Sequence, residues 1–205
     1  MKTDKFNYHL PEQLIAQYPS ENRSDARLMV ALESIQHEVF KDIGAHFCSG
    51  DLLVLNQTSV IPARLFGEKS TGGKIEILLE RFLSDRQTLA QVGSSRTPKE
   101  GAQLIFSFAE ENFVATVRGR KENFFILEWS SDPQALFANH GQIPLPPYMN
   151  RAPEKIDKER YETIYANPEK KESVAAPTAG MHFDEPLLGE LKDQGVELGY
   201  VNLHV

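Results

Sequence analysis

The sequence predicts a mixed α/β fold that includes a small antiparallel β domain. Strand-like runs separated by turn residues follow one another between Arg64 and Trp129, with no convincing helix among them. From Val174 onward the pattern becomes strand, loop, helix and strand, which favours a parallel sheet with a right-handed crossover. A chain of 205 residues is long enough for one large domain or two small ones.

Composition and charge are those of an ordinary soluble globular protein. Hydrophobic residues make up 40% and charged residues 25%, and no apolar run approaches the roughly 18 residues that span a bilayer. The N-terminus lacks the apolar core of a signal peptide and Cys48 is the single cysteine, so we expect a cytoplasmic protein without an internal disulfide framework. A formal net charge of -7 argues against a protein that coats nucleic acid, but it allows one local basic patch.

The N-terminal region carries short elements in front of one apolar strand. Residues 11–17 read as a short helix with a proline in its first turn, and residues 28–32 and 38–40 as strands around a turn. Leu52–Leu55 is a continuous apolar run, which predicts a strand buried on both faces.

Alternating apolar and polar residues mark the central β region. Residues 74–80 alternate in this way, and the turn 71–73 in front of them makes residues 64–69 the partner strand. Turn residues separate the further strands that we expect at 88–92, 103–108, 113–117 and 123–129. This pattern predicts an antiparallel barrel or a sandwich, and it does not decide between them.

Helix signals return after Trp129. Asp132 and Pro133 begin a helix that Gly141 ends, and the prolines of residues 143–148 predict an extended linker. A further helix is expected from Asp157 to about Ala166.

The C-terminal region predicts a strand at 174–176, a loop from Pro177 to Phe183, a helix capped by Asp184, and a strand at 196–205. The chain stops in or directly after this last strand. A buried parallel strand is an unusual terminus, so we expect either a shortened form of a larger protein or a sheet completed in another way.

Two segments would lie beyond the carboxyl ends of the predicted parallel strands, where ligands bind in open α/β sheets. One is the loop 177–183, whose small residues allow close backbone approach, whose Thr178 offers a hydroxyl and whose His182 titrates near neutral pH. The other is His204. The alternative is that the loop is only a connection and that each histidine is a hydrogen-bonded structural residue.

Further polar and aromatic side chains extend this candidate site. Asn56, Thr58 and Arg64 follow the apolar strand, where a rigid scaffold would position them, although they also fit a turn and a surface ion pair. Tyr161 and Tyr165 would share one helix face next to Arg160 and either stack on a base or pack on a neighbouring element. P-loop, GxGxxG, HExxH and CxxC motifs are absent, which argues against the common nucleotide, metalloprotease and redox classes.

Several segments, taken in series, resemble one enzyme family, the S-adenosylmethionine:tRNA ribosyltransferase-isomerases. The resemblance covers essentially the whole chain, in matching order and spacing. The segments are FNYHLPEQLIAQYP from Phe6, GDLLVLNQTSVIPARLFG from Gly50, TGGKIEILL from Thr71, IPLPPYMNR from Ile143, DKERYETIYA from Asp157, AAPTAGMHF from Ala175 and the final VNLHV.

This resemblance implies a layered α/β domain, made of residues 1–65 and 143–205, with an antiparallel β-barrel domain inserted at 66–142. It also implies that the C-terminal part of the family fold is missing, because family members continue well beyond LHV. The family pattern differs at Gln57 and Ser59, where Asp and Arg are usual.

The family transfers and isomerises the ribosyl moiety of S-adenosylmethionine onto the 7-aminomethyl-7-deazaguanine base at the tRNA wobble position. Epoxyqueuosine forms, and adenine and methionine leave. The resemblance implies a monomer that uses S-adenosylmethionine as co-substrate, with no metal and no resident cofactor.

By this resemblance the catalytic candidates are His182, Thr178 and His204. The candidates for substrate binding are Asn56, Thr58, Arg64, Arg160, Tyr161, Tyr165, Pro177, Ala179, Gly180 and Phe183. Two alternatives stay open: a truncated, non-catalytic RNA- or protein-binding module on the same scaffold, and a different S-adenosylmethionine-dependent enzyme.

Overall fold

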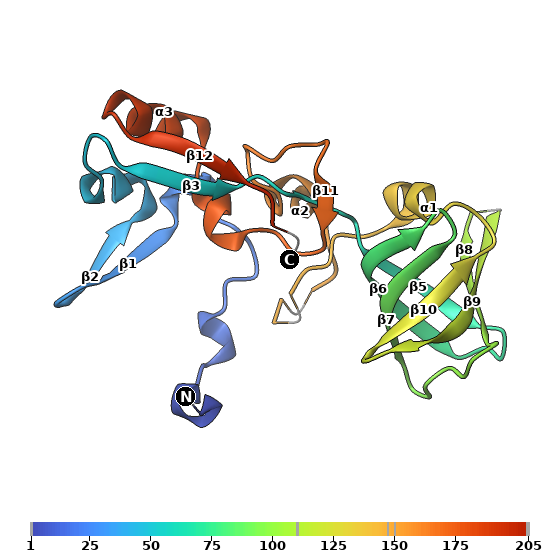
Figure 1. Ribbon diagram of the computed structural model, residues 1–205. Helices are drawn as coiled ribbons and strands as arrows, with labels where there is room; N and C mark the ends of the chain where they lie inside the picture. Colours follow the sequence, from blue (N-terminus) through green and yellow to red (C-terminus); the bar gives the residue numbers. More distant parts are fainter. Residues whose placement is uncertain (1, 110, 147, 150, 204–205) are drawn as a thin grey trace.

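The computed structural model describes residues 2–109, 111–146, 148–149 and 151–203. A closed β-barrel lies at one end of the molecule and a mixed α/β part at the other, and the chain passes between them twice (Figure 1). The N-terminal segment extends away from the α/β part. The predicted mixed α/β fold with an antiparallel barrel is therefore confirmed.

The barrel contains six antiparallel strands in the order β10-β7-β6-β5-β8-β9, so the alternative of a sandwich is excluded. All the strands predicted between Arg64 and Trp129 are present, and several run longer than their apolar core suggests. The strands are β5 (Arg64–Lys69), β6 (Lys74–Ser84), β7 (Gln87–Ser94), β8 (Gln103–Phe108), β9 (Glu111–Lys121) and β10 (Phe124–Trp129).

Alternate side chains of these strands fill the barrel. The best-buried residues, Leu65, Ile77, Leu79, Leu104 and Leu127, are at most 1% exposed. Two rings pack among them, with the centroids of Phe106 and Trp129 5.3 Å apart. The indole Nε1 of Trp129 donates a buried hydrogen bond of 2.9 Å to Thr88 Oγ1, which satisfies the one polar atom of that ring.

The N-terminal region is built from 3-10 turns and one hairpin. β1 (Arg27–Ala31) and β2 (Ile35–Val39) pair antiparallel, as predicted. The prediction of a helix at 11–17 is wrong, because this stretch contains one 3-10 turn, Glu12–Leu14, in its place. The other 3-10 turns in this region are η1 (Thr3–Phe6), η3 (Arg23–Asp25) and η4 (Phe40–His46).

Two separate parallel pairs replace the sheet predicted at the C-terminus. β12 (Glu197–Val201) pairs with β3 (Leu52–Asn56), whereas β11 (Lys171–Ser173) pairs with β4 (Ser59–Val60). The strand expected at 174–176 therefore lies three residues too far along the chain, and it does not share a sheet with β12. Pairing between distant segments decided this outcome, and local sequence does not encode it.

β3 is buried on one face only, which corrects the prediction of a doubly buried strand. Leu55 packs in a cluster with Phe183, Leu187, Leu188 and Leu191. The side chains on the other face, Leu52 and Val54, are 59% and 54% exposed. Burial therefore alternates between the two faces of β3, although residues 52–55 are all apolar.

Helix α1 (Pro133–His140) begins and ends as predicted, because Asp132 accepts a hydrogen bond from Gln134 N and Gly141 follows its last turn. Helix α3 (Glu185–Asp193) is likewise capped by Asp184. Helix α2 (Lys155–Arg160) differs: Glu154 is its N-cap, and the Asp157 carboxylate closes a capping box. The prediction of a helix from Asp157 to Ala166 is therefore wrong.

The backbone of Arg64 bonds to that of Gln142, with N···O distances of 3.1 and 2.8 Å, so the chain enters and leaves the barrel at adjacent points. The proposed domain limits, 1–65 with 143–205 and 66–142, stay a prediction. Of the helices in the described part of the chain, none has both the length and the apolar character needed to cross a membrane.

We expect Thr88→Val to lower the free energy of unfolding by about 1–3 kcal/mol, because it leaves the buried Trp129 Nε1 without an acceptor. Urea denaturation followed by tryptophan fluorescence measures this loss. Thr97→Val, at an exposed loop position, is the matched control. Equal losses in the two variants would contradict the assigned hydrogen bond.

Candidate functional site

The loop predicted to carry chemistry forms a 3-10 turn, η5 (Thr178–His182), between β11 and α3. Thr178 and Ala179 are exposed, Pro177 is half-buried, and Gly180 and Phe183 are buried. The loop therefore presents a hydroxyl and a stretch of backbone on its outer side, while its inner side is part of the core.

Gly180 packs directly against Tyr165. A Cβ atom at position 180 would overlap the Tyr165 hydroxyl and would lie 3.1 Å from Thr163 Cγ2. Only glycine fits this position without movement of the tyrosine, so the loop depends on the absence of a side chain here.

His182 lies half-buried beside aromatic rings. Its ring centroid is 5.3 Å from that of Phe40, which in turn meets Phe183 edge-on at 5.0 Å. Burial lowers the pKa of His182 below its ordinary value of 6.5; a hydrogen bond with the Arg23 backbone acts against this, and the Arg23 charge adds to it. The imidazole is therefore neutral at pH 7 and able to accept a proton.

Arg23 and Arg160 join the N-terminal segment to this region. The Arg23 guanidinium donates to Met181 O and to Glu159 O, each at 3.0 Å. Arg160 donates in the opposite direction, to Glu21 O and Ser20 O, each at 2.9 Å. Arg160, which was predicted to bind substrate, thus binds backbone carbonyls in this structure. The sequence analysis did not identify Arg23 as part of this region.

Asn56 and Thr58 hold strand ends in place. Asn56 Oδ1 accepts from Thr58 N at 3.2 Å and from Leu203 N at 3.1 Å, which joins the ends of β3 and β12. Thr58 is 2% exposed, and its hydroxyl donates to Lys170 O at 3.4 Å. His204, the third catalytic candidate, lies outside the described residues.

Arg64, Tyr161 and Tyr165 are held in different places. Arg64 Nη2 donates to Leu145 O at 3.2 Å, and its Nε lies 2.9 Å from Glu76 Oε1. Tyr161 follows helix α2 and is buried with Val60, Leu145 and Ala176. Tyr165 packs beside Tyr200, with centroids 6.3 Å apart. The expectation that the two tyrosines share one helix face is therefore wrong.

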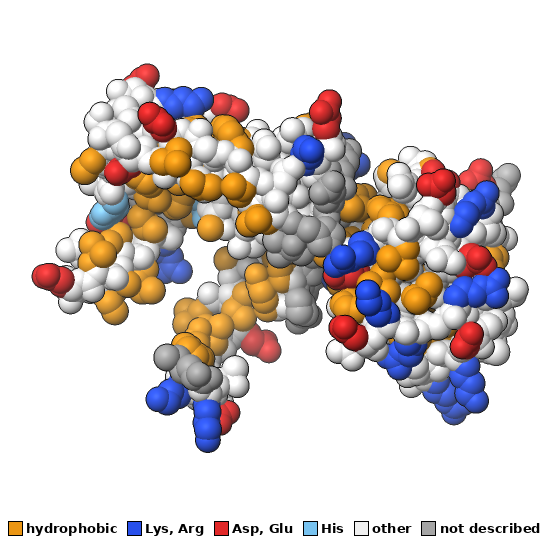
Figure 2. Space-filling model, viewed as in Figure 1, with side chains coloured by type: hydrophobic (Ala, Val, Ile, Leu, Met, Phe, Trp, Pro, Cys, Tyr) orange, Lys and Arg blue, Asp and Glu red, His pale blue; other side chains and the backbone are white. Residues whose placement is uncertain are grey.

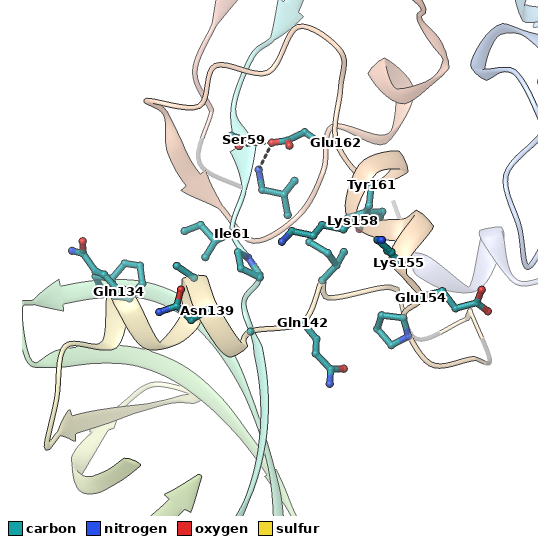
Figure 3. Close-up of a pocket in the computed structure, with 17 residues that line it drawn as sticks. Ser59, Ile61, Gln134, Asn139, Gln142, Glu154, Lys155, Lys158, Tyr161 and Glu162 are labelled. Carbon is teal, nitrogen blue, oxygen red and sulfur yellow. Dashed lines mark hydrogen bonds between the residues drawn. The ribbon is translucent and has the colours of Figure 1, made fainter. Parts of the chain in front are cut away.

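A cavity of about 690 Å³ lies between the barrel and α2, at the point where the chain crosses between the two parts (Figure 3). That volume suits a nucleoside-sized ligand. Tyr161 is the one predicted site residue in its lining. The lining comprises Ser59, Val60, Ile61, Pro62, Phe82, Gln134, Ala138, Asn139, Gly141, Gln142, Ile143, Pro153, Glu154, Lys155, Lys158, Tyr161 and Glu162.

The polar groups of this cavity can bind an anionic or amide-bearing ligand. Lys158 reaches from α2 toward Ile61 (Figure 3). The Glu162 carboxylate accepts from Ser59 Oγ and, at 3.3 Å, from Val60 N, which fixes its orientation. The amides of Gln134 and Asn139 come from α1 on the opposite wall.

One apolar cluster links this cavity to the loop. Val60 and Tyr161 line the cavity and also pack with Ala176, while Met181 packs against the same cluster from η5. Sequence reasoning missed the two lysines and Glu162. Their spacing of three and four positions, directly after the proline-rich linker, is the signal that could have found them.

The described residues include no group of three or more His, Cys, Asp or Glu side chains that could hold a metal ion. The expectation that no metal or resident cofactor takes part stays a prediction.

A sequence model of the family described as "Queuosine biosynthesis protein" matches residues 3–205. The chain belongs to this queuosine biosynthesis family. The resemblance noted from the sequence segments is therefore confirmed at the level of the family.

Members of the queuosine biosynthesis family that are similar to this chain are named S-adenosylmethionine:tRNA ribosyltransferase-isomerase. The protein from Acinetobacter baumannii (strain AYE) is 47% identical over 207 residues, which cover 100% of this chain and 59% of that protein. The protein from Stenotrophomonas maltophilia (strain R551-3) is 46% identical over 211 residues, covering 100% and 60%. This chain thus spans 59% of the length of the first relative.

A solved structure is similar as well. The S-adenosylmethionine tRNA ribosyltransferase of Thermotoga maritima is 32% identical, and the match covers 98% of this chain and 58% of that chain, with a TM-score of 0.39.

In this member of the queuosine biosynthesis family, we expect Gly180→Ala to cost about 1–3 kcal/mol of folding free energy, because the new methyl group overlaps Tyr165 Oη. Tyr165→Phe in the same chain should recover part of that loss, and a double-mutant cycle by urea denaturation measures the coupling. Gly189→Ala in α3, where nothing lies within 4 Å of the new Cβ, should instead stabilise. Additive effects of the first two substitutions would contradict the contact.

We also expect the stability of the chain to depend on the protonation of His182. The unfolded chain takes up a proton as the pH falls below 6.5, whereas the folded chain resists it because burial lowers the pKa. The free energy of unfolding should therefore fall as the pH drops from 7.5 toward 5, and His182→Gln should weaken this dependence. His37→Gln, at an exposed position, is the matched control. Identical pH profiles for wild type and His182→Gln would exclude this effect.

Proposed function

We propose that the chain acts in the transfer and isomerisation of the ribosyl moiety of S-adenosylmethionine onto the 7-aminomethyl-7-deazaguanine base of tRNA. The product is epoxyqueuosine, and adenine and methionine are released. The observation that supports this most is 47% identity, over 100% of this chain, to a protein named for that activity. Because the chain spans 59% of that relative, the activity and both substrates are proposals here.

The proposal extends to the two substrates, the location of the protein and its oligomeric state. The RNA substrate is a tRNA that carries the 7-deazaguanine base at the wobble position of its anticodon. S-adenosylmethionine is a co-substrate, and no resident cofactor or metal is invoked. We place the protein in the cytoplasm, as a monomer.

His182 fits one requirement of this chemistry. The sulfonium of S-adenosylmethionine acidifies the adjacent carbon, so a neutral base close to that carbon can start the reaction. The lowered pKa of His182 keeps its imidazole unprotonated at neutral pH. The two other catalytic candidates are Thr178, whose exposed side chain can donate a hydrogen bond to a departing group, and His204.

The remaining candidates divide into those that touch substrate and those that support the site. The exposed outer side of the loop, at Pro177 to Ala179, can approach S-adenosylmethionine, and Gly180 and Phe183 hold that loop against the core. Asn56, Thr58, Arg64 and Arg160 bond mainly to neighbouring backbone, so we propose that they position the walls of the site.

The cavity beside α2 supplies room for the nucleoside of either substrate. Its two lysines suit an acidic group, such as the carboxylate of S-adenosylmethionine or a phosphate of RNA. Its amide side chains suit the hydrogen-bonding edge of a base that has been extruded from the anticodon loop.

We expect the 205-residue chain, incubated with S-adenosylmethionine and tRNA carrying the 7-aminomethyl base, to release free adenine and methionine. Mass spectrometry of the small molecules and of the digested tRNA measures the reaction. His182→Ala should reduce turnover by about 100-fold or more, the usual contribution of a positioned general base. His37→Ala, at an exposed position on β2, is the control.

The outcomes separate the open alternatives. Full turnover by His182→Ala would remove this residue from the chemistry. Binding of tRNA without release of adenine would contradict the proposed activity and support a non-catalytic RNA-binding module. Consumption of S-adenosylmethionine without a change in the tRNA would support a different S-adenosylmethionine-dependent enzyme.

A further inference from the structure

Three turns of the antiparallel barrel, β5–β6, β7–β8 and β9–β10, lie at the end opposite the one where the chain enters and leaves, and each carries cationic side chains. The strand register places the β5–β6 turn beside the start of β8, because Ser70 N donates to Gln103 O at 3.0 Å. It also places the middle of β9 beside the start of β8, because Gln103 pairs with Thr116 and Gly101 N donates to Val117 O, and β9 then runs on to its turn after Lys121. The cations of this end, which we call the distal cluster, are Lys69, Lys74, Arg96, Lys99, Arg120 and Lys121.

The distal cluster has few local counter-charges. Among the described residues, none of its members lies within 4.0 Å of a carboxylate, whereas Arg64, Arg81 and Arg118 on the same barrel all form ion pairs. Three acidic side chains, Glu68, Glu100 and Glu122, are also at this end, so a net positive charge remains. Figure 2 shows Lys and Arg side chains gathered over the lower end of the barrel.

These cations are accessible. Lys74, Arg96, Lys99, Arg120 and Lys121 are exposed. The Lys69 ammonium donates to Arg96 O at 2.9 Å, which holds the β7–β8 loop against the β5–β6 turn. The Arg120 guanidinium lies 4.5 Å from the centroid of the Phe125 ring, so its position is partly set by the barrel itself.

The rest of the molecule has a net negative charge. Outside the barrel strands acidic residues outnumber basic ones, which is why the chain as a whole has a net charge of -7. Three arginines outside the barrel, Arg23, Arg151 and Arg160, already donate hydrogen bonds to backbone carbonyls or to a carboxylate of the protein itself. A polyanion that approaches the protein is therefore repelled over most of its surface and attracted at the distal end of the barrel.

We propose that the distal cluster is a docking surface for the phosphate backbone of RNA. The inference rests on the proposed function, in which the substrate is a tRNA far larger than the nucleotide that reacts. Contacts of Lys and Arg with phosphates carry no sequence information, but they set the register and orientation of the nucleic acid. A second contact, away from the cavity and the loop 177–183, orients the tRNA while one base is extruded.

The test compares two triple variants of equal charge change. Lys74→Gln, Lys99→Gln and Lys121→Gln neutralise one exposed lysine in each turn of the distal cluster. Lys5→Gln, Lys41→Gln and Lys192→Gln neutralise three exposed lysines outside the barrel. Binding of fluorescently labelled tRNA, with and without the 7-aminomethyl base, is measured by anisotropy over a series of KCl concentrations, after thermal melts have established that both variants are folded.

We expect the distal variant to bind tRNA at least about tenfold more weakly, and its plot of log K against log salt to be shallower by about one unit for each lysine removed. The control variant should change both quantities little. Equal behaviour of the two variants, or no measurable tRNA binding by the wild type, would overturn the proposal. Weakening that is independent of salt would also overturn it, because phosphate contacts release counterions.

Adenine release, measured after S-adenosylmethionine has been added to the samples with tRNA that carries the 7-aminomethyl base, separates this proposal from the proposed function. If the wild type binds tRNA through the distal cluster but releases no adenine, the docking surface stands and the proposed reaction fails. If the wild type releases adenine while the two triple variants bind equally, the reaction stands and the docking surface fails.

Discussion

The backbone bridge between Arg64 and Gln142 is the constraint on which the arrangement of this molecule depends. It joins the first barrel strand to the segment that leaves the barrel, so the two crossings lie side by side. Gly141 makes this approach possible, because a Cβ atom there would overlap the carbonyl oxygen of Pro62. The cavity lined by α1, α2, β4 and the residues that follow β4 lies beside this junction, and Gly141 and Gln142 are part of its lining.

The two parts are stabilised in different ways. The barrel has a continuous apolar core in which buried side chains from all its strands pack together. The α/β part has two smaller clusters, and polar contacts of fixed geometry complete it. Chief among these is the ion pair of Arg151 with Asp157, with two N···O distances of 2.6 Å, which helps to keep the pKa of that carboxyl low. The loop contributes Phe183 to one of these clusters and Met181 to the other, whereas the cavity lies between the cluster of Val60 and Tyr161 and the barrel.

The barrel could be predicted from the sequence because each strand alternates and each turn carries its own signal. The first residues of α1 and α3 could also be predicted, because Asp132 and Asp184 cap the two helices through side-chain hydrogen bonds. Partners of the parallel strands could not be predicted, because β3 and β12 are far apart in sequence. The start of α2 was misplaced because Glu154 is an uncommon N-cap, and Asp157 resembles one. The connection at 177–183 before the helix capped by Asp184 was predicted and is present, and its role in the site stays a prediction. The cavity could not be predicted, because segments distant in sequence build its walls.

Hydrogen bonds of three arginines fix the N-terminal segment to the rest of the α/β part, and they have a consequence for sequence variation in this segment. Arg151 Nε donates to Gln17 O at 2.7 Å, and Arg160 donates to the carbonyls of Ser20 and Glu21. Arg23, which belongs to the segment itself, donates in return to the carbonyls of Glu159 and Met181. A carbonyl accepts a hydrogen bond whatever side chain its residue bears. The residues at positions 20 and 21 can therefore be substituted while the backbone keeps its path. Substitution of the arginines, by contrast, removes the hydrogen bonds that hold this path.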